Sequence, residues 1–389
     1  VFSEREVALA RWMASFYLCS PGEALSSMIP SGRREVEVPS FDAVDELSDG
    51  KIALTDEQQA AVDEITSAQS PMYYLFGVTG SGKSEVFFRS ARHIIDSGRQ
   101  VIYLVPEITL THQLSRMVSS RFPGRVAVLH SALTASQRLD QWKKILTGQV
   151  DLVIGARSAV FAPCPRLGMI IIDEEHENSY KAGSTPRYHA RQVAQKRCTD
   201  AGATLVMGSA TPSLEAWKQM HEDGVMRKLV LSHRVGGGTP PVMTVVDMLK
   251  ENRTISRKLE EEIRRVLGKG KQVILFLNRR GYSYFFHCAT CGYEMMCPHC
   301  SVALTYHKNK GMVCHYCGYT RPPVTVCPDC GSLDVGYSGF GTEMVEQEVS
   351  RLFPTASLAR LDTDSAQDRD AMAKVLEDFR QGKIDILLG

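Results

Sequence analysis

The 389-residue sequence contains no apolar run that approaches the ~20 residues of a membrane-spanning helix. Its N-terminus also lacks the apolar core that a secretory signal peptide carries. These two absences disfavour a membrane protein and an exported protein, so we expect a cytoplasmic location.

An excess of charge of one sign is also lacking, because 45 Lys and Arg residues stand against 44 Asp and Glu residues. The net charge of +1 excludes a strongly basic protein that binds polyanions through its overall field, but not a groove lined by local basic side chains. The length predicts two or three globular domains.

Cysteine is rare outside one segment. Cys19, Cys164 and Cys198 stand alone, and the other eight cysteines lie within residues 288–330 as four C-x-x-C pairs. In a reducing compartment such pairs indicate metal ligands rather than disulfides. The candidate ligands are Cys288, Cys291, Cys297, Cys300, Cys314, Cys317, Cys327 and Cys330.

The spacing of these pairs predicts two tetrahedral Zn²⁺ sites. Five residues separate the first two pairs, which makes it hard to bring both around one metal, whereas the thirteen residues between the second and third pairs suit a hairpin. We therefore predict an inner site from the second and third pairs and an outer site from the first and fourth. A cross-braced arrangement is the alternative, and an iron–sulfur cluster is less favoured than zinc.

Residues 77–84 fit the phosphate-binding pattern G-x-x-x-x-G-K-[ST], between an apolar strand-like run at 72–76 and a helical pattern at 85–95. Glycines let backbone N–H groups turn toward phosphate oxygens, while the lysine reaches the β- and γ-phosphates and the serine ligates Mg²⁺. The residues expected to bind ATP with Mg²⁺ are Gly77, Thr79, Gly80, Ser81, Gly82, Lys83 and Ser84.

Further apolar strands alternate with helical patterns, which predicts a parallel sheet covered on both faces in an α/β lobe. The expected strands are 101–105, 126–129, 151–154, 169–172 and 204–207, and the expected helices are 107–120, 134–147, 190–201 and 213–221.

The sequence Asp-Glu-Glu-His at 173–176 follows the expected strand 169–172, where ligands of such sheets gather. We assign Asp173 to Mg²⁺ and Glu174 to the attacking water, which it would orient and deprotonate. The alternative is that acidic residues merely end the strand.

Gly-Ser-Ala-Thr-Pro at 208–212 either senses the γ-phosphate or forms a tight turn.

Gln58 and the segment 179–191 each allow two interpretations. Gln58 follows Thr55 at capping-box spacing, and it also lies about twenty residues before the phosphate loop, where a glutamine can contact adenine. Residues 179–191 interleave aromatic and basic side chains, as in sites that bind single-stranded nucleic acid, or they form a solvated loop. The candidate nucleic-acid ligands there are Tyr180, Lys181, Arg187 and Tyr188.

A glycine- and proline-rich stretch at 236–241 predicts a domain boundary. A second α/β pattern follows it, and the cysteine cluster interrupts that pattern. Its expected strands are 243–247, 272–277, 357–361 and 384–388, and its expected helices are 256–267, 342–352 and 366–380.

From about Leu54 to Gly389 these motifs resemble the PriA family, the bacterial primosomal replication-restart DNA helicases of superfamily two. The resemblance rests on 77–84, 154–158, 173–176, 208–212, 276–282 and the eight cysteines. It implies two RecA-like parallel-sheet lobes, with a cysteine-rich two-zinc insertion in the second. It also implies that Arg157 contacts DNA, and that the loop from Tyr180 to Arg191 couples DNA binding to hydrolysis.

The resemblance divides the chain into three parts, the last of which contains an insertion. Residues 1–50 correspond to a remnant of the N-terminal DNA-binding region plus a linker, 51–235 to lobe 1, and 236–389 to an incomplete lobe 2 with its zinc insertion at 287–332. Because the family's last two motifs, with a catalytic arginine, would follow residue 389, we expect a chain truncated at both ends that hydrolyses ATP slowly.

The predicted function is that of an ATP-dependent 3′-to-5′ DNA helicase of replication restart, with Lys83, Asp173 and Glu174 as its catalytic residues. Its implied cofactors are ATP, Mg²⁺ and two Zn²⁺. Its implied partners are forked and single-stranded DNA, single-strand-binding protein and other primosome proteins. The alternatives are a double-stranded DNA translocase without unwinding and a zinc-ribbon primosome scaffold with a vestigial ATPase.

Overall fold

The computed structural model divides into two compact units, residues 1–241 and 242–389. The described residues are 3–30, 53–67, 69–106, 112–130, 133–222, 224–237, 241–248, 251, 253–277, 284–288, 290–307, 311–338, 342–361 and 369–389. The predicted linker and residues 278–282 of the motif at 276–282 therefore lie outside the described residues.

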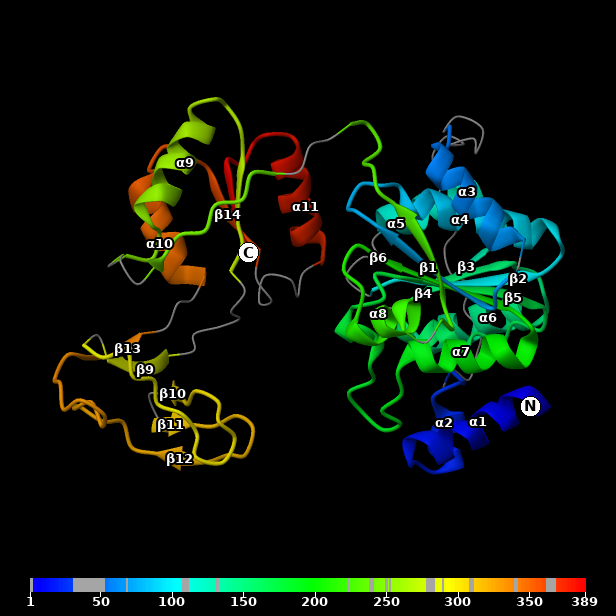
Figure 1. The fold of residues 1–389 in the computed structure, drawn as a ribbon, viewed down its shortest axis with the longest axis horizontal. Helices are drawn as coiled ribbons and strands as arrows, with labels where there is room; N and C mark the ends of the chain where they lie inside the picture. The colour runs from blue at the N-terminus through cyan, green and yellow to red at the C-terminus, as the bar shows by residue number, and fades with distance from the viewer. Residues whose placement is uncertain are drawn as a thin grey trace. The chain divides into compact units, whose positions relative to one another are not determined.

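The first unit is built on a parallel sheet covered by helices (Figure 1). The sheet has seven strands in the order β3-β4-β2-β5-β6-β1-β7. The strands are β1 (Met72–Gly77), β2 (Gln100–Leu104), β3 (Val126–Leu129), β4 (Leu152–Gly155), β5 (Leu167–Asp173), β6 (Thr204–Ser209) and β7 (Arg227–Leu231). The parallel sheet predicted from the apolar runs is confirmed. The edge strand β7 was not predicted, because it is half-exposed and carries no continuous apolar run.

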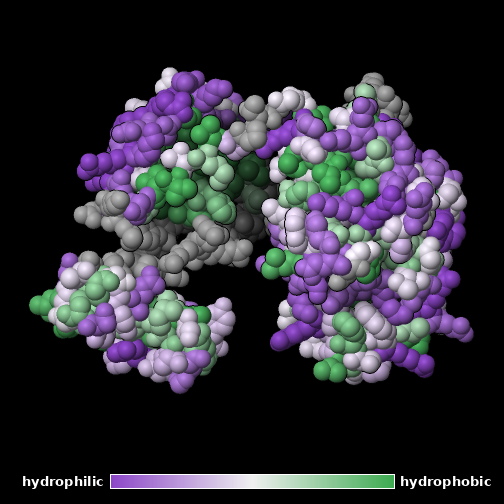
Figure 2. All heavy atoms as spheres, viewed as in Figure 1, coloured by the Kyte–Doolittle hydropathy of each residue, from purple (hydrophilic) through white to green (hydrophobic). Residues whose placement is uncertain are grey.

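Helices cover both faces of this sheet, because alternate side chains of each strand enter two different cores. Tyr73 and Leu75 share a core with α3 (Asp56–Thr66), α4 (Lys83–Asp96) and α5 (His112–Arg121). Met72 and Tyr74 share the other core with α6 (Ala135–Leu146), α7 (Ala190–Ala201) and α8 (Leu214–His221). Hydrophilic residues cover most of the visible outer face of this unit (Figure 2).

The N-terminal helices belong to the first unit. Helix α1 (Glu4–Tyr17) begins at a capping box of Ser3 and Glu6, and α2 (Pro21–Ser26) follows it. Leu9 and Met13 of α1 lie in the same core as α7. Two short 3-10 helices, η1 (Arg157–Phe161) and η2 (Asn178–Tyr180), follow β4 and β5.

The second unit contains a three-stranded parallel sheet with the order β14-β15-β8. Its elements are β8 (Val273–Leu275), β14 (Leu358–Arg360), β15 (Ile386–Leu388), α9 (Arg257–Leu267), α10 (Thr342–Leu352) and α11 (Arg369–Arg380). The prediction of a strand at 243–247 is wrong, because residues 241–248 are irregular and Val242, Met243 and Val245 are exposed. These residues have the β-branched composition of a strand, but no strand pairs with them among the described residues.

The cysteine-rich insertion forms its own antiparallel sheet between β8 and α10, with the order β12-β11-β10-β9-β13. Its strands are β9 (Tyr284–Cys288), β10 (Thr305–His307), β11 (Gly311–Val313), β12 (Thr320–Arg321) and β13 (Val335–Ser338).

None of the helices in the described ranges has the length and apolar composition that a membrane crossing requires.

Candidate nucleotide site and metal centres

The loop between β1 and α4 requires glycine at two positions. Gly80 and Gly82 have φ values of +80° and +79°, where a side chain is strained. A Cβ added at Gly82 would also lie 2.3 Å from Nε2 of Gln58. The loop therefore holds its shape because its glycines accept a left-handed backbone and a close neighbour.

Lys83 is the first residue of α4, so its charge adds to the positive end of the helix dipole. Its Nζ atom donates a hydrogen bond of 3.0 Å to the carbonyl oxygen of Gly77. Thr79 and Ser84 are exposed, and Ser81 Oγ is buried without a hydrogen-bond partner among the described residues. This loop of backbone donors around one cation fits a nucleotide's phosphates.

Gln58 supports the loop as well as capping α3. Its Oε1 atom accepts from Thr55 N at 2.9 Å, and Thr55 Oγ1 accepts from Gln58 N at 3.3 Å, which completes the capping box. Its Nε2 atom donates to the carbonyl oxygen of Ser81 at 2.9 Å. Both ends of this buried amide are thus engaged within the protein, and an adenine contact stays a prediction.

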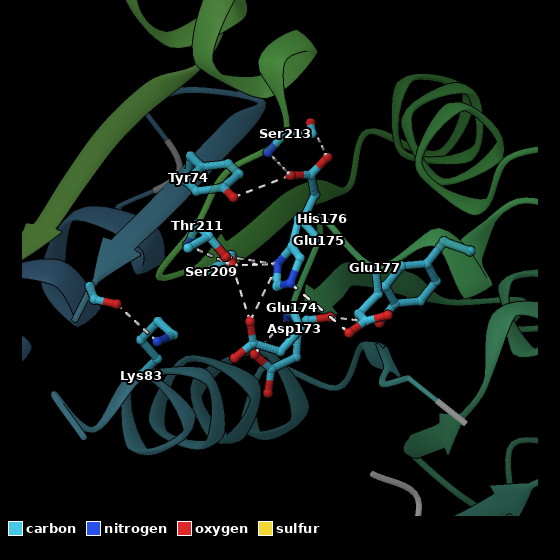
Figure 3. A network of polar contacts seen from close by, with 12 residues as sticks. Tyr74, Lys83, Asp173, Glu174, Glu175, His176, Glu177, Ser209, Thr211 and Ser213 are labelled. Atoms are coloured by element: carbon cyan, nitrogen blue, oxygen red, sulfur yellow. Dashed lines mark hydrogen bonds and ion pairs between the residues drawn. The ribbon is translucent and has the colours of Figure 1, made fainter. Parts of the chain in front are cut away.

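Asp173 ends β5, at the same edge of the sheet as the phosphate loop (Figure 3). Its carboxylate accepts from Tyr103 Oη at 2.9 Å and from Glu174 N at 3.0 Å. Burial raises the pKa of Asp173, against these two hydrogen bonds, which lower it. A buried carboxylate at this edge fits a divalent cation, whose positive charge would favour the ionised form.

Glu174 has a φ of +46°, a conformation that costs a non-glycine residue about 1–3 kcal/mol. The resulting turn brings its Oε2 atom within 3.0 Å of the hydroxyl of Ser209, which donates to it. His176 Nδ1 lies 2.7 Å from the same hydroxyl and 3.4 Å from Thr211 Oγ1 (Figure 3). The motif at 208–212 therefore contacts the acidic motif directly.

Glu175 is a residue that sequence reasoning did not assign. Its side chain is 0% exposed and forms an ion pair with Arg191. It also accepts from Tyr74 Oη at 3.2 Å, from Ser213 N at 3.2 Å and from Ser213 Oγ at 2.7 Å (Figure 3). These partners lie far away in sequence, so no local pattern reveals that this second glutamate is buried.

Replacing Glu175 by alanine is expected to destabilise the first unit by about 3–5 kcal/mol, because Arg191 and the other donors would lose their buried acceptor. The matched control is Glu215→Ala, since Glu215 lies 3.9 Å from the same Arg191 but is 69% exposed. We expect the control to cost less than about 1 kcal/mol. Equal losses in denaturant unfolding would contradict this account of the network.

The two tyrosines predicted to contact nucleic acid are buried. Tyr180 is 1% exposed, and its Oη atom donates to the carbonyl oxygen of Asp173 at 2.6 Å. Tyr188 is 6% exposed and packs against Phe161, with 4.8 Å between ring centroids. In this conformation tertiary packing uses both rings, so a contact of Tyr180 or Tyr188 with nucleic acid stays a prediction.

The basic residues of the same segment remain accessible. Lys181 and Arg187 are exposed, and the Nζ atom of Lys181 lies 2.5 Å from the carbonyl oxygen of Arg187, to which it donates. Arg157 is half-buried and donates to the carbonyl oxygens of Ser179 and Lys181 at 3.2 and 2.6 Å. Arg157 therefore holds this loop, while Lys181 and Arg187 present their charges to solvent.

The eight clustered cysteines form two groups of four, and within each group all Sγ atoms lie within 4.8 Å of one another. The grouping is the nested one, with sulfur separations such as 3.6 Å for Cys297–Cys317 and 3.7 Å for Cys291–Cys327. A zinc tetrahedron with Zn–S bonds of about 2.3 Å needs sulfurs about 3.8 Å apart. The cysteines therefore fit two single-metal zinc sites. An iron–sulfur cluster fits poorly, because its thiolates bind separate irons.

Two family models match the chain. The model described as DEAD/DEAH box helicase matches residues 55–220, and the model described as PriA DNA helicase Cys-rich region (CRR) domain matches residues 297–322. The replication restart protein PriA of Treponema pallidum is 50% identical over 392 residues, which cover 100% of this chain and 59% of that protein. This stretch of chain belongs to the PriA family.

Other PriA relatives agree. The protein of Borreliella burgdorferi is 32% identical and covers 100% of this chain, and that of Bacillus subtilis is 44% identical and covers 87% of it. The chain in turn spans 59% of the first relative and 43% of the second. The resemblance to the PriA family drawn from the motifs is thus confirmed.

A solved structure agrees in fold alone. The crystal structure of the DUF1998 helicase MrfA bound to DNA matches with a TM-score of 0.50 and 16% identity, and the match covers 92% of this chain and 46% of that one. Together with the parallel sheets and the two cysteine groups, this confirms the predicted fold class for this member of the PriA family, RecA-like helicase lobes with a two-zinc insertion.

Proposed function

We propose that this chain is the motor region of an ATP-dependent DNA helicase of replication restart, which couples ATP hydrolysis to 3′-to-5′ translocation and unwinding. The observation that carries the proposal is the meeting of a phosphate loop and the pair Asp173–Glu174 at one edge of a parallel sheet. Membership of the PriA family supports the choice of stalled replication forks as its place of action.

In the proposed mechanism, the backbone of residues 77–82 and the cation of Lys83 hold the β- and γ-phosphates of ATP. Ser84 and Asp173 would hold Mg²⁺, which neutralises charge on the phosphate oxygens when it is bound. Glu174 orients the attacking water and accepts its proton at a carboxylate oxygen. Ser209 donates to Glu174 at 3.0 Å and so limits the positions that this carboxylate can take.

Lys181 and Arg187 are the proposed contacts to DNA phosphates, because both are exposed on the loop that follows the acidic motif. Arg157 would position this loop through its hydrogen bonds to Ser179 and Lys181. The proposed partners are forked and single-stranded DNA, single-strand-binding protein and other primosome proteins, in the cytoplasm.

Strand displacement on a forked DNA tests the proposal, in a chain that spans the full length of the PriA relatives. The helicase predicts ATP-dependent release of one strand. A translocase without unwinding would instead consume ATP on DNA and release no strand. A primosome scaffold would bind DNA and show no detectable ATP binding.

Replacing Lys83 by alanine is expected to weaken binding of a non-hydrolysable ATP analogue about 10- to 100-fold, because a charged hydrogen bond contributes about 1.5–3 kcal/mol. The fold should persist, since Lys83 bonds only to Gly77 O in the described structure. Lys196→Ala is the control, because Lys196 forms an ion pair with Asp200 within α7, away from the phosphate loop. Calorimetry that finds equal affinities in all three proteins would refute the assignment of the loop.

A further inference from the structure

The segment Leu231–Val235, which follows β7, closes one side of the phosphate loop. Val78 N donates to the carbonyl oxygen of Leu231 at 3.3 Å, and Val235 N donates to the carbonyl oxygen of Gly80 at 2.9 Å. A Cβ added at Gly82 would lie 3.2 Å from Cγ2 of Val235. This segment therefore contacts the loop through both its backbone and its side chains.

The same segment is also fixed to α3. The carboxylate of Glu57 accepts from Ser232 N at 2.9 Å, and its other oxygen lies 3.0 Å from His233 Nδ1. Arg234 thus lies between two anchored neighbours, His233 before it and Val235 after it. Its backbone position beside the loop is determined on both sides.

The first part of the Arg234 side chain lies beside the tip of the loop. Its Cγ atom is 4.0 Å from the position that a Cβ added at Gly80 would take. The residue is half-buried, and its guanidinium has no ion-pair or hydrogen-bond partner among the described residues. The nearby acid Glu57 is already engaged by Ser232 and His233. An arginine held in this way is suited to an anion that occupies the loop.

We propose that Arg234 is a second cation of the nucleotide site and contacts the phosphate oxygens of a nucleoside triphosphate held at residues 77–84. This inference rests on the proposed ATP site. The planar guanidinium can bond two phosphate oxygens at once, which the point charge of Lys83 cannot do. Bound nucleotide would then hold the segment 231–237, by which the chain leaves the first unit, against the phosphate loop.

The test compares Arg234→Gln with Arg227→Gln, because Arg227 lies on the adjoining strand β7 in a surface pair with Glu64 and is 49% exposed. Both variants are titrated with a non-hydrolysable ATP analogue and Mg²⁺. Arg234→Gln is expected to raise the dissociation constant about 10- to 100-fold, and Arg227→Gln to leave it unchanged. Hydrogen exchange of the Val235 amide should slow with nucleotide in the wild-type chain but not in Arg234→Gln.

An affinity of Arg234→Gln within about twofold of the wild type would overturn the inference. If this variant loses stability, Arg234→Lys keeps the charge and is expected to restore part of the affinity. A lysine variant that binds no better than the glutamine variant would count against a role for the charge. A wild-type chain that does not bind the analogue would instead refute the proposed ATP site itself, so the two failures are distinguishable.

Discussion

Removal of the two zinc ions is expected to unfold residues 288–330 and to leave the first unit folded. The insertion has a small apolar core, of which Phe286, Met295, Leu304 and Met312 are the fully buried members other than cysteine. So few buried side chains cannot offset the conformational entropy lost on folding of the segment unless metal ions or cross-links add stability. A structural zinc site contributes about 10–16 kcal/mol of apparent binding free energy, which here is folding free energy.

Hydrogen exchange before and after chelation measures this directly, with β1 and β5 of the first unit as the internal reference. Elemental analysis should find two zinc ions per chain. Cys297→Ser is expected to release the inner metal and Cys288→Ser the outer one. Cys164→Ser is the control, because this buried cysteine lies in the first unit. One metal per chain, or iron in place of zinc, would contradict the two-zinc assignment.

Replacing Glu174 by glutamine is expected to lower ATP hydrolysis about 10²- to 10⁴-fold, because the amide cannot accept the proton of the attacking water. Nucleotide affinity should stay within about twofold of the wild type, since Glu174 is not among the groups proposed to hold the phosphates. The measurement is single-turnover hydrolysis with bound nucleotide quantified separately, in a chain that spans the full length of the PriA relatives.

The control for this variant is Glu177→Gln. Glu177 lies three residues farther along the chain, and its nearest ion-pair partner is His176, at 4.0 Å. This substitution removes a similar charge near the site and keeps the proposed proton acceptor Glu174, so hydrolysis should be unchanged. Equal rates for Glu174→Gln and the wild type would assign proton transfer to another group.

Features with a strong local pattern could be predicted from the sequence. The phosphate loop is one, because its glycines, lysine and flanking strand and helix are contiguous. The parallel sheet is another, because its central strands are apolar on both faces and therefore read as unbroken runs. Loop lengths between the C-x-x-C pairs were enough to favour the nested metal sites.

Features that depend on contacts between distant segments could not be predicted. The burial of Glu175 depends on Arg191 and Ser213, which lie 16 and 38 residues away. Tyr180 and Tyr188 have the composition of a base-stacking loop, yet the core of the first unit uses their rings. Residues 243–247 have strand composition, but composition does not supply a neighbouring strand to pair with.

The central proposal, that this chain carries the ATP site of a DNA-stimulated helicase motor, is tested most directly by one measurement. ATP hydrolysis is followed with and without single-stranded DNA, in wild-type and Lys83→Ala proteins that span the full length of the PriA relatives. Our account predicts hydrolysis that rises when DNA is added and is lost in the variant. A hydrolysis rate that does not change when DNA is added, or that is the same in Lys83→Ala, would contradict it.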